Sequence, residues 1–299
     1  MRTAETLRNE AIANALDAAC TSRPADVVRA SEPLYKALAL ASGLPGPRAN
    51  LTLAQAFAVD CATRGKRADH VLFAMATLDA EAAPGASGRE FVPLCGVVGL
   101  GARAAADEEL RDRVLPLLHD AAEDLRFRVR EAVPLALVRL GAAMGEELAR
   151  YVIDHDWMDG YFQATAVLLA LGDRAWLSTF ETPDLPLDVL ERAFVLARDA
   201  PRAAARYPGR KALVEALEKI PAAVGARFGR ATFDRLTQWS ETKHPEMRAV
   251  IEKNLADKRL SVHREAVKGV DRALAASKKP PRDPTRIIQG MRGRGKKRR

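Results

Sequence analysis

The sequence lacks the features that mark secreted and membrane proteins. It has only three cysteines in 299 residues, all in apolar surroundings, which argues against a disulfide framework and favours an intracellular, cytoplasmic protein. Its longest stretch without a charged residue, Gly160–Gly172, is 13 residues long, whereas a membrane-spanning helix needs about 20 apolar residues. Glu5 and Glu10 stand where a signal peptide would carry its apolar segment. We therefore expect neither export nor a membrane partner.

Motifs of nucleophilic catalysis and of cofactor binding are also missing. The sequence contains no G-x-S-x-G element and no recognisable catalytic triad. The segment Gly99–Ala104 (GLGARA) fits the loose form of a dinucleotide-binding fingerprint, but that fingerprint needs a preceding strand. Here the segment aligns instead with two other expected helix ends. We therefore reject nucleotide binding and predict no cofactor.

An acidic cluster is the candidate metal site. The segment Asp154–Asp159 carries three aspartates and a histidine within six residues, and such ligands can hold a divalent cation. The cluster falls between two expected helices, however, where Asp commonly caps a helix, and no other histidine lies at ligand spacing. We interpret the segment as a turn and predict no bound metal.

What the sequence does contain is helix-forming residues in amphipathic patterns. Hydrophobic residues make up 48% and charged residues 29% of the chain, enough to bury a core, and no run alternates long enough to indicate a strand. We expect helices near 3–19, 25–42, 50–63 and 67–80, and at Asp107–His119, Val129–Leu140 and Val262–Ala275. Asn50 is placed to cap a helix after a corner at 43–48, and Gly141 to end one. The expected class is all-α.

Similar segments recur at irregular intervals of roughly 30–45 residues, as in repeat proteins. Val92–Cys95 (VPLC) matches Val133–Ala136 (VPLA), and Arg130–Val133 (REAV) returns at Arg264–Val267. A pair of short helices cannot bury both of its faces alone, so each pair must stack on its neighbours. The recurrence therefore predicts an α-solenoid of antiparallel helix pairs.

One repeat has a specific form. Leu115–Asp120 (LPLLHD) followed by Val129–Ala132 (VREA) resembles a HEAT repeat, which has a proline-bent first helix, an acidic turn and a Val-Arg opening of the second helix. A looser copy lies at Trp239–Leu255. The resemblance covers the HEAT-like repeats, at 88–277. Residues 1–87 are expected to be helical but depart from the repeat pattern, which predicts an N-terminal helical capping region. The prolines that follow Lys279 and the lack of residues to bury predict a disordered basic tail at 278–299.

More narrowly, the chain resembles bacterial HEAT-like proteins that are related in fold to the alkyl-base DNA glycosylases. The resemblance is carried by Arg128–Glu131, Met247–Leu260 and Leu44–Leu51. Those enzymes place an Asp four residues after a Trp, and none of the three tryptophans here has that partner. Trp157 and Asp159 remain as candidate catalytic residues, although two positions on a helix point about 200° apart. Without a suitably placed acid, base excision loses its main electrostatic stabilisation.

Positive charge is concentrated at the C-terminal end. Residues 1–200 hold 21 Lys/Arg and 29 Asp/Glu, residues 201–277 hold 16 and 9, and residues 278–299 hold 10 and 1. Such an asymmetry indicates a polyanion or an acidic protein as partner of the C-terminal third.

Three cations recur every four residues within the expected helix Val262–Ala275. Arg264, Lys268 and Arg272 form one stripe, called the basic stripe below, opposite an apolar side. We predict nucleic-acid backbone contacts by this stripe, its neighbours and the tail end: Arg248, Lys258, Arg259, Arg264, Lys268, Arg272, Lys296, Lys297, Arg298 and Arg299. An ordinary solvated helix face is the alternative interpretation.

The function predicted from the sequence is therefore a non-catalytic HEAT-repeat binding protein that contacts nucleic-acid backbone. Two alternatives stay open, a protein–protein scaffold with an acidic partner and a glycosylase-like repair enzyme for alkylated bases. The 35 Arg against 12 Lys indicate a GC-rich, bacterial genome, although the preference of Arg for phosphates would produce the same bias.

Overall fold

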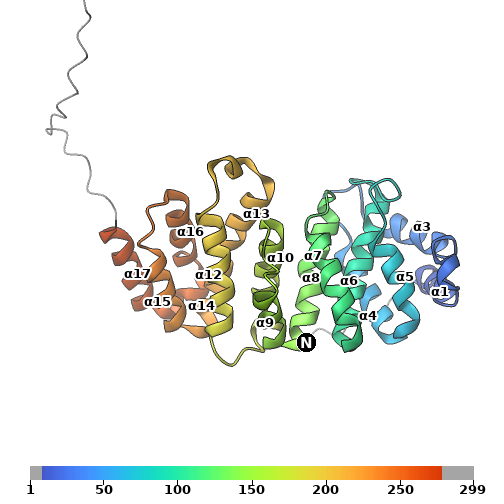
Figure 1. Cartoon of the computed structure of the whole chain (residues 1–299), viewed down its shortest axis with the longest axis horizontal. Coiled ribbons are helices and arrows are strands. Elements are labelled where there is room, and N and C mark those ends of the chain that lie inside the picture. The colour runs from blue at the N-terminus through green and yellow to red at the C-terminus, as the bar shows by residue number, and fades with distance from the viewer. Residues whose placement is uncertain (1–8, 278–299) are drawn as a thin grey trace, which may run out of the picture.

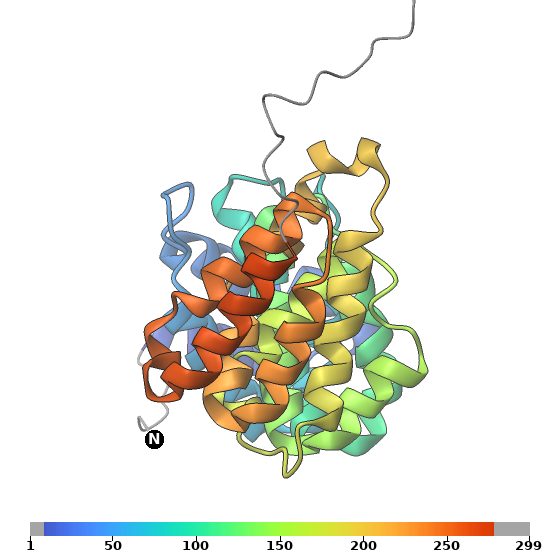
Figure 2. The ribbon, with the colours of Figure 1, turned by 90° about the vertical axis from the view of Figure 1, so that its left-hand side faces the viewer.

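The computed structural model describes residues 9–277, and this part of the chain is helical, with no β-strand. The expected all-α class is confirmed. The helices follow one another along the long axis, from α1 at one end to α17 at the other (Figure 1), and Figure 2 looks along that axis from the α17 end. The α-helices are α1 (Glu10–Cys20), α2 (Val27–Ala30), α3 (Glu32–Ala41), α4 (Leu51–Arg64), α5 (Lys66–Ala76), α6 (Phe91–Ala106), α7 (Arg111–Ala122), α8 (Phe127–Met144), α9 (Glu146–Asp154), α10 (Tyr161–Leu171), α11 (Arg174–Leu177), α12 (Asp184–Arg198), α13 (Pro208–Leu217), α14 (Ile220–Phe228), α15 (Arg230–Trp239), α16 (Pro245–Leu255) and α17 (Arg264–Ala276). Short 3-10 helices are η1 (Pro24–Asp26), η2 (Gly88–Glu90), η3 (Glu108–Leu110), η4 (Arg202–Arg206) and η5 (Lys258–His263).

Alternate helices of the chain lie side by side. The helices α4, α6, α8, α10 and α13 each pack against the next one, while α7 packs against α6 and α8, and α12 against α9, α10 and α13. The matching segments Val92–Cys95 and Val133–Ala136 lie in α6 and α8, which pack on each other. Within the series α4, α6, α8, α10 and α13, each inner helix therefore buries one face against the preceding member and another face against the following member.

A single hydrophobic core extends from Ile12 in α1 to Leu274 in α17. Its centre is α6, which is buried along nearly its whole length and packs against α4, α5 and α8. The core crosses residue 87, the expected limit of the capping region, without interruption, because α4 and α5 cover α6 directly.

Three pairs of consecutive helices are joined by one glycine each. Gly65 links α4 to α5, Gly145 links α8 to α9, and Gly229 links α14 to α15, with φ of 62°, 60° and 55°. These positive φ values are open to glycine at no steric cost and strained for other residues. The sharp reversal lets the second helix of each pair fold back against the first.

Gly141 does not end a helix, so that prediction is wrong. The helix α8 continues to Met144, and Gly145 follows it. Gly141 lies inside α8 because its missing side chain makes room for the indole of Trp176. The GLGARA segment likewise lies within α6 rather than at a helix end, and no strand precedes it in the described part of the chain.

Other helix bounds differ from the expected ones for local reasons. The segment 25–42 divides into η1, α2 and α3, with a break at Ser31 followed by Pro33 in the first turn of α3. The helix expected at Asp107–His119 begins as η3, and the one expected at Val262–Ala275 begins as η5. The predicted cap at Asn50 is confirmed, because the Asn50 side chain accepts a hydrogen bond from Leu53 N at 3.1 Å.

Candidate nucleic-acid interface

The basic stripe lies on the exposed side of α17. Val270 and Leu274 are buried against α15 and α16, which turns Arg264, Lys268 and Arg272 toward solvent. The stripe is not purely cationic, however, because Lys268 Nζ pairs with Glu265 Oε1 at 2.8 Å. Within residues 9–277, Arg264 and Arg272 have no carboxylate partner. The free positive charge of α17 therefore resides in its two arginines.

The 3-10 helix η5 presents two more of the predicted cations. Lys258 is exposed and makes no ion pair with the described residues. Arg259 forms a two-pronged bond to Asp257, with Nε 3.0 Å from Oδ1 and Nη2 2.8 Å from Oδ2. This hydrogen bonding lowers the pKa of Asp257 and raises the pKa of Arg259, because each charged form stabilises the other. Much of the charge on Arg259 is thus balanced locally.

Arg248 is turned inward rather than toward a ligand. Its guanidinium donates to the carbonyl oxygens of Ser240 and Leu274 and to Ser277 Oγ. These bonds connect α16 to the turn after α15 and to the end of α17. The geometry gives Arg248 a role in holding the last three helices together. The predicted tail residues Lys296, Lys297, Arg298 and Arg299 lie outside the described residues.

The structure brings the two candidate catalytic residues together through a third residue. Trp157 is 4% exposed, and its Nε1 donates to Leu115 O at 3.3 Å. His119 packs edge-on against Trp157, with ring centroids 5.2 Å apart, and its Nε2 lies 2.8 Å from Asp159 Oδ1. Trp157 therefore contributes to the core and has no open ring face, while Asp159 holds a histidine. His119 gave no signal in the sequence because it lies 40 residues from Asp159.

The other two tryptophans are also structural. Trp176 is fully buried and donates from Nε1 to Gly145 O at 3.0 Å. Trp239 stacks on Phe194, with centroids 4.1 Å apart, and donates to Glu191 Oε2 at 2.7 Å. Neither ring lies open at a surface where a nucleobase could stack on it.

The segment Asp154–Asp159 is the turn between α9 and α10, as its composition predicted. His155 stacks on Tyr151 with ring centroids 4.1 Å apart, and Asp159 contacts His119 as described above. Among residues 9–277, no group of three or more His, Cys, Asp or Glu side chains is arranged to hold a metal ion.

Two segments that carry the family resemblance touch each other. Arg128 at the start of α8 donates from Nη2 to Pro47 O at 2.9 Å, in the corner before α4. The backbone N–H of Arg128 is capped by the buried carboxylate of Glu90 at 2.8 Å. Arg128 thus connects the corner before α4 to the start of α8. Arg48, in the same corner, is exposed.

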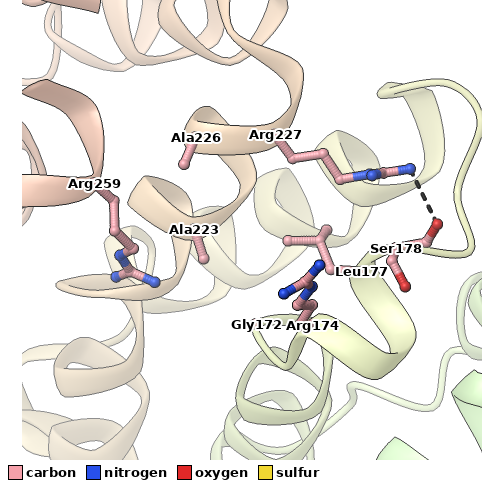
Figure 3. A pocket seen from close by; sticks show the side chains of 8 residues that line it. All are labelled: Gly172, Arg174, Leu177, Ser178, Ala223, Ala226, Arg227 and Arg259. Atoms are coloured by element: carbon pink, nitrogen blue, oxygen red, sulfur yellow. Dashed lines mark hydrogen bonds between the residues drawn. The ribbon is translucent and has the colours of Figure 1, made fainter. Parts of the chain in front are cut away.

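A pocket of about 520 Å³ contains three arginines, two of which the sequence did not single out. Arg174 of α11, Arg227 of α14 and Arg259 of η5 line it, and the Arg227 side chain extends toward Ser178 (Figure 3). We call it the arginine pocket. Its remaining lining comes from small and apolar residues and Ser178, and no carboxylate lines it. Arg174 and Arg227 lie 53 residues apart in the chain, so only the packing of α10, α11 and α14 reveals their proximity.

No protein-family model and no curated protein matches the sequence. No helix between residues 9 and 277 has both the length and the apolar character needed to cross a membrane.

Proposed function

We propose that the protein is a HEAT-like α-solenoid that binds the backbone of nucleic acid through its C-terminal third and catalyses no reaction. The solenoid part of the proposal is supported by the side-by-side packing of alternate helices and by the recurring one-glycine links. It is supported further by the matching segments Val92–Cys95 and Val133–Ala136, which lie in the neighbouring helices α6 and α8. Stacked layers of this kind offer an extended surface rather than a deep active site.

The observation that carries the nucleic-acid part is a set of exposed cations without acidic partners. Lys258, Arg264 and Arg272 lie at the α17 end of the molecule, all exposed and none paired with a carboxylate of the described residues. Cations that balance no internal charge are available for phosphates, and each neutralised phosphate releases counterions. Residues 278–299, which follow α17 in the sequence, hold 10 Lys/Arg and 1 Asp.

The non-catalytic part of the proposal follows from the two candidate catalytic residues. A glycosylase of this class has to stack an aromatic ring against the substrate and set a free carboxylate beside the developing charge. Trp157 is enclosed by the core, and the Asp159 carboxylate contacts His119. No observation favours base excision over simple binding.

The proposal is tested by fluorescence anisotropy with a labelled 20-base-pair duplex at several salt concentrations. We compare the full chain, the chain ending at 277, the double variant Arg264→Gln/Arg272→Gln, and Arg23→Gln/Arg29→Gln as a charge-matched control near α1. Arg23 and Arg29 are 87% and 88% exposed, far along the chain from the proposed surface. We expect the α17 variant to bind at least tenfold more weakly with a shallower salt dependence, and the control to bind like wild type.

Three results would replace the proposal. Loss of binding on removal of 278–299 alone would restrict the activity to the tail. Equal losses in the two double variants would indicate net charge rather than a surface. Binding of an acidic protein, with no duplex binding, would identify a protein–protein scaffold instead.

A further inference from the structure

The arginine pocket is formed where three successive helix layers meet. Gly172 and Arg174 come from the break between α10 and α11, Ala226 and Arg227 from the end of α14, and Arg259 from η5. Gly172 permits this arrangement, because a Cβ atom there would lie 2.5 Å from the side chain of Ile220 at the start of α14. The arginines are thus positioned by the core packing, not by a mobile loop.

Two of the three guanidinium groups are held in place before any ligand arrives. Arg227 donates from Nη2 to Ser178 O (Figure 3) and also to Phe180 O. Arg259 donates from Nη2 to Lys219 O at 2.8 Å and is paired with Asp257. Groups held in this way lose little conformational entropy on binding, which favours affinity.

The pocket also carries net positive charge. The charge on Arg259 is balanced by Asp257, but Arg227 is held by neutral carbonyl groups, and Arg174 has no hydrogen-bond partner among the described residues. Two guanidinium groups therefore face the pocket without a neutralising carboxylate. Arg174 and the unused Nε and Nη1 of Arg227 remain as donors, and guanidinium groups match the oxygen geometry of phosphate.

The floor of the pocket is apolar. Leu177 is buried, and it lies beside Ala223 and Ala226, while the exposed Ser178 offers a hydroxyl at the rim. The apolar floor leaves the three arginines as the only charged groups that line the pocket. The volume of about 520 Å³ is large enough for a phosphate together with an attached sugar.

We infer that the arginine pocket binds a phosphate group, with Arg174 and Arg227 as the phosphate-binding residues and Arg259 beside them. The assignment of that phosphate to a nucleic-acid strand rests on the function proposed above. The binding of phosphate itself does not, because it follows from the three arginines and the floor alone. A small phosphorylated molecule is the other source of the same chemical group.

Two substitutions test the pocket without removing a structural contact. Arg174→Gln removes a charge from an exposed side chain that has no hydrogen bond in the described structure. Ala226→Glu keeps all three arginines and places a carboxylate among them, on an exposed position of α14. The matched controls are Arg202→Gln and Ala203→Glu in η4, which are exposed and directly precede α13. In Figure 1, α13 lies in the upper part of the molecule and α14 in the lower part.

The first measurement is isothermal titration of the full chain with inorganic pyrophosphate. We expect one binding site in wild type and in both controls, and at least tenfold weaker binding in Arg174→Gln and Ala226→Glu. Circular dichroism and thermal unfolding should show that all four variants remain folded. Absence of pyrophosphate binding in wild type, or binding that both pocket variants retain, would overturn the inference.

The second measurement uses the labelled duplex and separates the two sources of phosphate. Weaker duplex binding in the pocket variants alone, with the slope of log K against log salt reduced by about one unit, assigns the phosphate to nucleic acid. Unchanged duplex binding combined with lost pyrophosphate binding assigns the pocket to a small phosphorylated ligand. If wild type binds pyrophosphate but no duplex, the proposed function fails while the pocket stands.

Discussion

The indole of Trp176 lies directly against the backbone of Gly141, in the space that a side chain at position 141 would occupy. The contact joins α11 to α8, and Trp176 Nε1 also donates to Gly145 O at 3.0 Å, in the one-residue link that follows α8. Because Trp176 is fully buried, the indole has no room to move away. The short helix α11 is therefore fixed to the preceding helix layer by one glycine and one tryptophan.

Substitution Gly141→Ala should destabilise the protein even though alanine favours helix. Alanine gains about 1 kcal/mol of intrinsic helix preference over glycine, but a methyl group at 141 overlaps the indole, and overpacking typically costs about 1–3 kcal/mol. Because a Cβ atom at 141 would overlap several atoms of the rigid indole, we expect a cost at the upper end of this range and a net loss of about 2 kcal/mol in the free energy of unfolding, measured by urea denaturation. The control is Gly269→Ala in α17, where a Cβ atom would have no neighbour within 4 Å. Gly269→Ala should be neutral or stabilising. If Gly141→Ala were as stable as wild type, the Trp176 indole would have to shift to make room for the methyl group.

The sequence predicted those features that depend on neighbouring residues. The cap at Asn50 requires only an amide side chain before a helix, and the buried side of α17 follows from its apolar spacing at Val270 and Leu274. Both are determined within one or two helical turns. Periodicity and capping are local signals, so they can be read without the fold.

Features that depend on distant contacts were not predicted. Gly141 has the sequence context of a helix end, and only the distant Trp176 explains why the helix continues. Arg248 was expected at the interface, but carbonyl groups 8 and 26 residues away bind its guanidinium. The arginine pocket combines residues from three helix layers. Sequence spacing carries no information about such contacts.

The ion pair between Arg89 and Glu32 should make stability depend on pH. Arg89 donates to both carboxylate oxygens of Glu32, at 2.8 Å and 3.1 Å, and connects η2 to α3. This hydrogen bonding lowers the pKa of Glu32 in the folded protein, so the folded state binds the proton less readily than the unfolded state. The ion pair therefore contributes to the free energy of unfolding above the ordinary pKa of Glu, about 4.3. This contribution is lost as the pH falls through the lowered pKa that Glu32 has in the folded protein. We expect Glu32→Gln to be less stable than wild type at pH 7, with the difference shrinking toward pH 3 in urea denaturation.

A second carboxylate provides the control for this pH dependence. Glu81 is exposed and forms no ion pair with the described residues, so Glu81→Gln should follow the wild-type stability at every pH. If the free energy of unfolding of Glu32→Gln were lower than that of wild type by the same amount at pH 7 and pH 3, the Glu32 carboxylate would contribute no proton-linked stability.

Replacement of the buried Asn254 side chain, which lies where α13 ends and α14 begins, should cost much stability. The helix α13 ends at Leu217, and α14 begins at Ile220. The Asn254 side chain of α16 bonds to both helices: Nδ2 donates to Leu217 O at 2.7 Å, and Oδ1 accepts from Ala222 N at 2.8 Å. The side chain is fully buried, so no water can replace these bonds. Substitution Asn254→Leu leaves two buried backbone groups unsatisfied, at about 1–3 kcal/mol each. We expect a loss of about 2–5 kcal/mol in the free energy of unfolding.

The control for this loss is Gln238→Leu on α15, which also exchanges an amide for leucine but at an exposed position. Its stability should stay within about 0.5 kcal/mol of wild type. Asn254→Asp separates hydrogen bonding from packing, because it keeps an acceptor for Ala222 N but has no donor for Leu217 O and introduces a buried charge. We expect Asn254→Asp to be strongly destabilised at pH 7 and partly recovered at pH 4 to 5, since burial raises the pKa of a carboxyl group and protonation restores a donor. If Asn254→Leu lost less than about 1 kcal/mol, the break between α13 and α14 would be stabilised by its apolar packing alone.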